Sequence, residues 1–238
     1  MNERPISPWL AAMAAVLAAL SLAGCSGPRP IAYSHLGSTP YLRPTPDDAN
    51  GRTPYVFAVP VNWRQYHRVI IDPVEIYDGP DAQFGKIPSQ GQAYLARVMQ
   101  QRFTTRLARD FTIVTQPAPD TLRIHLTLTG ASATPPVIGT LSHFDLAGGS
   151  YNAVQGLRGK PGMVSGAVVY AVEIRDARSG QLLRAEVTRQ YPAAMNIGAS
   201  FGPMKAAEKG IEKGAEALAR RITGNDEAIA PTFRAPQP

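Results

Sequence analysis

The chain has 238 residues, 44% of them hydrophobic, and a formal net charge of +6 at pH 7. It contains one cysteine, so no internal disulfide can form and packing alone must stabilise the fold. The basic residues are scattered rather than gathered in a run, which argues against nucleic-acid binding and is typical of a solvated surface. A basic balance can also attract anionic lipid head groups or other polyanions.

The first 25 residues have the layout of an export signal. A short polar start precedes an uncharged run rich in Ala and Leu, from Ile6 to Leu22, and small residues follow it. The alternatives are a signal anchor that stays in the membrane as a helix and a soluble secreted protein. About 17 apolar residues are at the short limit for a membrane span, and no charged stop follows them, which weakens the anchor alternative.

The tetrapeptide Leu22-Ala23-Gly24-Cys25 resembles the lipobox of bacterial lipoproteins. The resemblance implies that residues 1–24 are a signal peptide, that the chain is cut between Gly24 and Cys25, and that the Cys25 sulfur carries a diacylglyceryl group. In this class a further acyl chain, such as palmitate, usually modifies the new amino terminus. Ser26 stands where many such bacteria place Asp to retain a lipoprotein in the inner membrane. The resemblance therefore implies an outer-membrane protein, anchored through Cys25 and facing the periplasm.

Residues 25–54 are rich in proline and have little apolar periodicity. Such chain is extended and semi-rigid, near 3 Å per residue, so it is predicted to be a flexible tether that holds the domain several nanometres from the bilayer. Four apolar side chains leave open that part of it lies along the domain: Tyr33, Leu36, Tyr41 and Leu42.

Residues 55–224 are predicted to form one folded domain, which begins with two strands. Alternation over 55–61 indicates an edge strand, given its proline, and 69–76 indicates a second strand with a break at Asp72-Pro73. Between the strands, Trp63 and Tyr66 belong to a polar-aromatic cluster. They are candidate partner-binding residues, although aromatic residues beside strands more often form the rim of a core.

The clearest helix signal covers residues 89–109. Ser89 is placed as an N-cap and Gln92 completes a capping box, and apolar residues then recur at helical spacing. A short strand over 111–115 follows, and then strict alternation over 121–129 predicts a half-buried strand with His125 on its wet face.

Residues 130–165 lose all periodicity and are rich in glycine and proline, yet they are too apolar for a plain linker. Connections of this length tend to be functional or disordered. The segment can be a flap over a groove, a subunit contact or a disordered loop. Its aromatic residues Phe144 and Tyr151 are further candidate partner-binding residues.

The last elements are a hairpin and a helix. Strands over 166–175 and 181–191 flank a turn in which Gly180 supplies a positive φ angle. The final helix begins near Pro203 and ends before Gly224, and Gly210 and Gly214 allow close packing, preferably on the sheet rather than on another chain. The tail, 225–238, is predicted to be flexible.

This order of elements predicts an α+β fold, a mainly antiparallel sheet with two helices packed on one face and a wet opposite face. With its lipobox, its strand-to-helix unit and the ending strand–Asp-x-x-Ser-Gly–strand–helix, the chain resembles an uncharacterised family of Gram-negative lipoproteins, a domain of unknown function. That resemblance implies location and architecture, and no activity.

Residue spacing gives no sign of catalysis. The four histidines are far apart and outside metal-ligand motifs, and no Gly-x-Ser-x-Gly motif occurs. Four acids near one strand end resemble a paired-carboxylate site, but turn chemistry explains the last two: Asp72, Glu75, Asp78 and Asp81. No catalytic residue, metal or cofactor is predicted.

The predicted function is that of a lipid-anchored envelope lipoprotein whose non-enzymatic periplasmic domain binds another envelope component, protein or polymer. The alternative is an auxiliary lipoprotein of an envelope lipid or small-molecule transport system. An enzyme would need His, Asp or Glu to converge beneath the flap.

Overall fold

The computed structural model describes residues 28–46, 48, 51–133, 166–191 and 204–224. The lipobox, most of the 130–165 segment and the tail lie outside these residues. The described part contains two long helices and one eight-stranded sheet, so the predicted α+β class is confirmed. Neither of these helices is long and apolar enough to cross a membrane.

The strands form one mixed sheet in which antiparallel pairs dominate. Its order is β1 (Arg43–Pro44), β2 (Tyr55–Ala58), β8 (Leu182–Gln190), β7 (Ala167–Asp176), β6 (Thr121–Ser132), β3 (Arg68–Ile71) and β5 (Thr112–Ile113). A further short strand, β4 (Glu75–Ile76), pairs with β6. The pairs among β1, β2, β8, β7 and β6 are antiparallel. β3 pairs in parallel with β5 and β6, and β4 pairs in parallel with β6, because the chain crosses over through a helix between β4 and β5. The predicted break at Asp72-Pro73 separates β3 from β4. β6 runs on to Ser132, so the first three residues of the predicted flap belong to the sheet.

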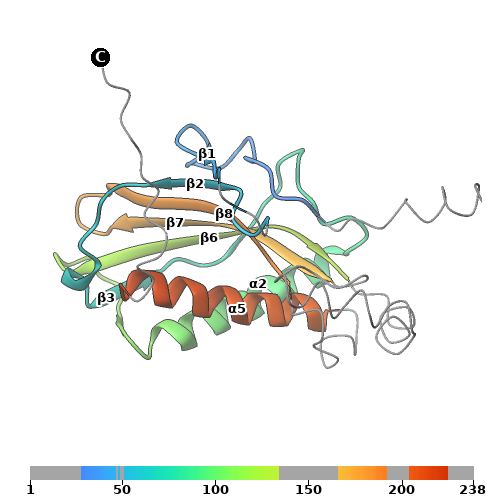
Figure 1. Ribbon diagram of the computed structural model, residues 1–238. Coiled ribbons are helices and arrows are strands. Elements are labelled where there is room, and N and C mark those ends of the chain that lie inside the picture. The colour runs from blue at the N-terminus through green and yellow to red at the C-terminus, as the bar shows by residue number, and fades with distance from the viewer. Residues whose placement is uncertain (1–27, 47, 49–50, 134–165, 192–203, 225–238) are drawn as a thin grey trace, which may run out of the picture.

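Helices α2 (Ser89–Leu107) and α5 (Lys205–Ile222) lie side by side on one face of the sheet (Figure 1). The alternation along β6 and β7 points one apolar row of each strand at these helices. From these two rows the core receives Leu122, Ile124, Leu126, Leu128, Val168, Tyr170, Val172 and Ile174. Both helices therefore lie where the sequence predicts them.

The start of α2 differs from the prediction by one position. Pro88 is the N-cap residue and Ser89 is the first helical residue, with no side-chain cap hydrogen bond. The proline fixes an extended backbone, so the helix begins at the next residue. Gln92 does reach back, but its Nε2 donates to the Ile87 carbonyl at 3.0 Å.

The second face of the sheet is not entirely wet, because the proline-rich segment packs on it. Tyr33 is fully buried there, and its ring meets that of Tyr77 edge-on at 5.2 Å. Burial raises the pKa of the Tyr33 hydroxyl to about 12. Of the two alternatives for this stretch, the flexible tether is wrong and packing along the domain is confirmed, since small side chains of β7 and β8 leave room for the aromatic ring. The residues in this second core are Tyr33, Leu36, Leu42, Tyr77, Val169, Ala171, Ala185 and Val187.

Backbone amides of the proline-rich segment are expected to resist hydrogen exchange. The Leu42 amide donates to Ser38, and the Thr45 amide donates to the Pro54 carbonyl at 2.8 Å. Both should exchange at least about 100-fold more slowly than in an unstructured peptide, because exchange requires local opening. Native-state hydrogen exchange followed by NMR measures this. Exchange at the unprotected rate would contradict the packing of this segment.

β8 carries buried polar side chains on the face that points toward α5. The Glu186 carboxylate pairs with Arg184 of the same strand at 2.8 Å and with Arg221 of α5 at 2.6 Å. Ala185 and Val187 lie on the opposite side of the strand, beneath the proline-rich segment. The helix-facing side of this strand is therefore held by charge pairing.

α5 lies very close to the sheet at its two glycines. A Cβ on Gly210 would lie 2.8 Å from the Gln190 carbonyl oxygen, and one on Gly214 would lie 1.8 Å from the Tyr170 hydroxyl. This confirms that the glycine pair serves packing within the chain. Gly180, with φ of 74°, closes the predicted hairpin, and Gly224, with φ of 76°, follows the end of α5.

Candidate functional site

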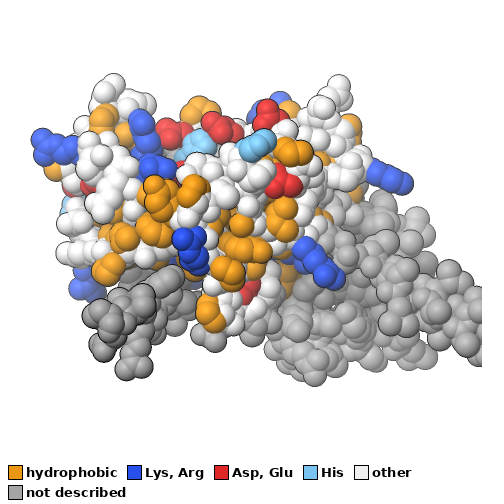
Figure 2. Space-filling view, turned by 90° about the horizontal axis from the view of Figure 1, so that it is seen from above, with side chains coloured by type: hydrophobic (Ala, Val, Ile, Leu, Met, Phe, Trp, Pro, Cys, Tyr) orange, Lys and Arg blue, Asp and Glu red, His pale blue; other side chains and the backbone are white. Residues whose placement is uncertain are grey.

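The uncovered part of the second sheet face carries a row of charged side chains. β6 points Arg123 and His125 to this face, because their neighbours fill the helix-side core. The pairing register places Arg123 opposite Arg175 and His125 opposite Glu173 on β7. The outer-face polar patch comprises Asp72, Glu75, Arg123, His125, Glu173 and Arg175. Figure 2 shows acidic and histidine side chains gathered on this face.

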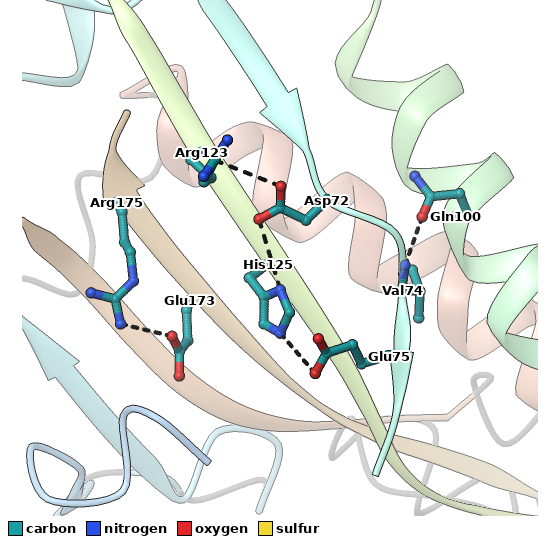
Figure 3. Close-up of polar contacts among 8 residues, drawn as sticks. All are labelled: Asp72, Val74, Glu75, Gln100, Arg123, His125, Glu173 and Arg175. Carbon is teal, nitrogen blue, oxygen red and sulfur yellow. Dashed lines mark hydrogen bonds and ion pairs between the residues drawn. The ribbon is translucent and has the colours of Figure 1, made fainter. Parts of the chain in front are cut away.

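His125 lies between two carboxylates of the neighbouring chain segment (Figure 3). Its Nδ1 is 3.8 Å from Asp72, and its Nε2 is 3.3 Å from Glu75. Arg123 Nε contacts the other oxygen of Asp72 at 3.6 Å. A protonated imidazole here would pair with both acids at once.

The break between β3 and β4 positions these two acids. In the break, the Val74 amide donates to the Gln100 side chain of α2 at 2.8 Å. This bond ties the bend to the helix layer below and leaves Asp72 and Glu75 on either side of His125. On β7, Arg175 Nη2 pairs with Glu173 at 3.0 Å (Figure 3).

The patch is partly open to solvent and its charges are mixed, but Glu173 is buried, with only 9% of its side chain exposed. The side chain of Glu75 is 65% exposed and that of Arg123 is 45% exposed. Opposite charges held in fixed positions on an accessible face suit the recognition of a polar partner. Within the described residues, no group of three His, Cys, Asp or Glu side chains could hold a metal ion.

The acidic cluster expected from the sequence is divided in the structure. Asp72 and Glu75 both contact His125, whereas Asp81 contacts the proline-rich segment. It accepts hydrogen bonds from the Tyr77 hydroxyl and from the Ser34 amide, and these bonds help to hold its pKa below the usual range although its slight burial opposes them. The paired-carboxylate arrangement therefore reduces to two acids around one histidine.

The partner-binding candidates from the sequence fall in different places. Tyr66 is buried, and its hydroxyl donates to Asp176 at 3.0 Å, which ties the start of β3 to the β7–β8 hairpin. Trp63, in the short 3-10 helix η1 (Trp63–Gln65), packs partly against the main core. Phe144 and Tyr151, like Cys25 and Gly24, lie outside the described residues.

Sequence reasoning placed His125 on the right face but missed its charged neighbours on β7. Glu173 and Arg175 lie in a strand whose other face is apolar, so their polarity is visible in the sequence. Only the register of β6 against β7 brings them beside Arg123 and His125.

Removing charge from the patch is expected to leave the fold intact. The variants Asp72→Asn and Glu75→Gln should each lower the free energy of unfolding by about 1 kcal/mol or less, because exposed ion pairs contribute little. Urea unfolding followed by circular dichroism measures the change. A loss well above about 2 kcal/mol would mean that the patch supports the fold rather than presenting a binding surface.

Several solved structures are distantly similar to the chain. PelC from Paraburkholderia phytofirmans, a dodecamer, shares 13% identity at a TM-score of 0.34, over 71% of this chain and 95% of that one. The hypothetical protein CT253 from Chlamydia trachomatis shares 11% identity at a TM-score of 0.34, over 67% of this chain and 99% of that one. Protein XCC0632 from Xanthomonas campestris, of the DUF330 family, shares 9% identity at a TM-score of 0.34, over 71% of this chain and 92% of that one. Similarity at this level says nothing about function.

No curated protein matches the chain significantly. One family, described as "Protein of unknown function (DUF3313)", matches residues 32–218. The match begins at the buried part of the proline-rich segment and runs into α5, so it includes most of both cores and the outer-face polar patch. The chain therefore belongs to the DUF3313 family of proteins of unknown function.

Proposed function

We propose that this protein is a lipid-anchored envelope lipoprotein whose domain acts by binding, not by catalysis. The observation that carries the proposal is the motif at residues 22–25, which ends an apolar export signal in the only cysteine of the chain. Two or three acyl chains at that cysteine would anchor the chain almost permanently, whereas one would not. The outer membrane is the proposed location, on the periplasmic side, because Ser26 is no inner-membrane retention signal.

The buried proline-rich segment changes where such an anchor would hold the domain. Tyr33 is fully buried in the second core, and it lies only eight positions after Cys25. Eight residue steps reach at most about 29 Å when fully extended. The domain would therefore lie close to the bilayer surface rather than several nanometres away.

The outer-face polar patch is the proposed contact for a partner in the envelope. Its exposed side chains carry both signs of charge, which favours a protein or polymer that presents complementary charged groups. The ion pairs across the strands hold these side chains in fixed positions. A surface of paired charges of this kind fits the binding of a polar partner.

Cellular fractionation of a Cys25→Ser variant tests the anchor. The wild type should fractionate with the outer membrane as a processed chain, whereas Cys25→Ser should remain uncut and unacylated. The matched variant Ser26→Asp keeps the cysteine and should move the protein to the inner membrane. The anchor is refuted if the wild type is as unprocessed as Cys25→Ser.

Site-directed photo-crosslinking tests the binding surface. A photoreactive residue in place of Arg123 should capture a discrete partner in the native envelope, whereas the same residue in place of Arg97 should not. Arg97 is an exposed arginine of α2, in the helix layer on the other face of the sheet from the patch. Identical adducts from both positions would contradict a role for the patch.

A further inference from the structure

Basic side chains gather around Tyr191, the buried residue that directly follows β8. The Arg52 guanidinium carbon lies 4.0 Å from the centre of the Tyr191 ring, and that of Arg189 lies 5.7 Å from it. Both distances fall within the range of cation–π attraction. The Tyr191 basic cluster is defined by Arg52 and Arg189 at the ring, together with Arg29 and Lys213, whose charges interact with those two arginines.

Hydrogen bonds fix this cluster in place. The Arg52 side chain donates to Gln190 at 2.9 Å, and the Arg52 carbonyl accepts from the Arg189 amide at 2.7 Å and from Thr188 at 2.9 Å. Asp48, an acid on this loop, accepts from the amides of Arg52 and Thr53, both at 3.0 Å. The cluster is therefore preorganised, and the Asp48 carboxylate is engaged by the backbone.

Among the described residues, the acids that interact with Tyr191 and Lys213 of this region are Asp48 and Glu216, fewer than the four basic side chains. Burial and the neighbouring Arg29 and Arg52 hold the pKa of the Arg189 guanidinium below its usual range. Burial and Arg52 do the same to the pKa of Lys213 on α5, although Glu216 partly opposes them. The Arg189 Nε is buried and has no hydrogen-bond partner among the described residues. An anion at this point would relieve the repulsion and accept that unused donor.

The position of Arg29 in the chain indicates that the anion is a lipid head group. Arg29 is exposed and only four residues from Cys25, at most about 14 Å of chain. With Cys25 in the bilayer, which rests on the proposed function, Arg29 would lie within reach of the lipid head groups. Guanidinium groups bind phosphate oxygens in a bidentate manner, so a phosphodiester head group matches them.

We propose that the Tyr191 basic cluster binds the phosphate of an anionic phospholipid in the membrane that holds the anchor. This contact would fix the orientation of the domain on the bilayer. It would also leave the outer-face polar patch free for a partner.

Binding of short-chain phospholipid to the full chain, purified from membranes in a neutral detergent, tests the proposal. Dihexanoyl-phosphatidylglycerol should bind, and Arg189→Gln should weaken it about tenfold, as expected for the loss of a charge-assisted hydrogen bond. The exposed variant Arg29→Gln should act in the same direction if Arg189→Gln fails to fold. The matched control Arg178→Gln removes one exposed positive charge in the β7–β8 turn, outside the cluster, and should leave affinity unchanged.

Two further ligands and one mass measurement separate the outcomes. Equal binding of dihexanoyl-phosphatidylcholine, or equal binding of inorganic phosphate, would overturn the proposal. Acylated Cys25 without a preference for phosphatidylglycerol overturns this inference and leaves the proposed anchor standing. Preference for phosphatidylglycerol with unmodified Cys25 supports the site and refutes the anchor.

Discussion

Replacing Glu186 with alanine is expected to lower the free energy of unfolding by about 3–5 kcal/mol. The Glu186 carboxylate lies beneath α5, between Arg184 at 2.8 Å and Arg221 at 2.6 Å, and its side chain is 6% exposed. The variant would leave two guanidinium groups without their acid, one of them almost entirely buried. Desolvated charge without a partner is far more costly than the loss of the ion pairs themselves.

Urea unfolding at neutral pH measures this loss, with Glu212→Ala as the matched control. Glu212 also belongs to α5 and pairs with Lys209 at 2.8 Å, but its side chain is 41% exposed. Its removal should change stability by about 1 kcal/mol or less. If Glu186→Ala costs no more than Glu212→Ala, the buried ion pairs do not support the packing of α5 on the sheet.

The same carboxylate predicts a pH dependence of stability. Burial opposes ionisation of Glu186, but Arg221 and Arg184 outweigh it and hold the pKa of the carboxyl below its usual range. Stabilisation from its ionised form is therefore complete above the unfolded-state pKa of about 4.3 and is lost as the pH falls through the lower, folded-state pKa. Urea midpoints measured at decreasing pH should fall more steeply in the wild type than in Glu186→Gln. Parallel pH profiles would contradict the depressed pKa.

Replacing Gly214 with alanine is expected to destabilise the protein by about 1–3 kcal/mol, the usual cost of overpacking a core. An alanine in the middle of an exposed helix would instead stabilise by about 1 kcal/mol. The added Cβ would lie 1.8 Å from the hydroxyl oxygen of Tyr170, whose side chain is almost completely buried and cannot swing away. α5 would have to move away from the sheet.

The variant Tyr170→Phe provides the control for this clash. It removes the hydroxyl oxygen, although the ring carbon at 2.9 Å remains. Gly214→Ala should therefore cost less in the Tyr170→Phe background than in the wild type, as a double-mutant cycle of urea unfolding would show. Equal costs in both backgrounds would mean that the hydroxyl does not set the distance between α5 and the sheet.

Local signals in the sequence were sufficient for the elements of the main core. Strict alternation identified β6, the turn ending in Gly180 identified the β7–β8 hairpin, and helical spacing identified α2 and α5. Each of these signals is confined to a few neighbouring residues, so it can be recognised without knowledge of the fold. The glycine pair of α5 was likewise readable, because small residues four apart make one close-packing stripe.

Contacts between distant segments could not be predicted in the same way. The proline-rich segment has no periodicity, and its burial depends on the small side chains Ala171 and Ala185 far along the chain. The outer-face polar patch depends on the β6–β7 register and on the break after β3. Neither leaves a local pattern, so the tether was predicted too long and Glu173 and Arg175 were missed.

Acylation at Cys25 underlies both the anchor and the position of the domain on the bilayer. The intact mass of the full chain, expressed in a Gram-negative host and extracted from its membranes, measures this directly. We predict the mass of residues 25–238 plus a diacylglyceryl group and a further acyl chain. A mass equal to that of residues 1–238, with an unmodified thiol, would contradict it.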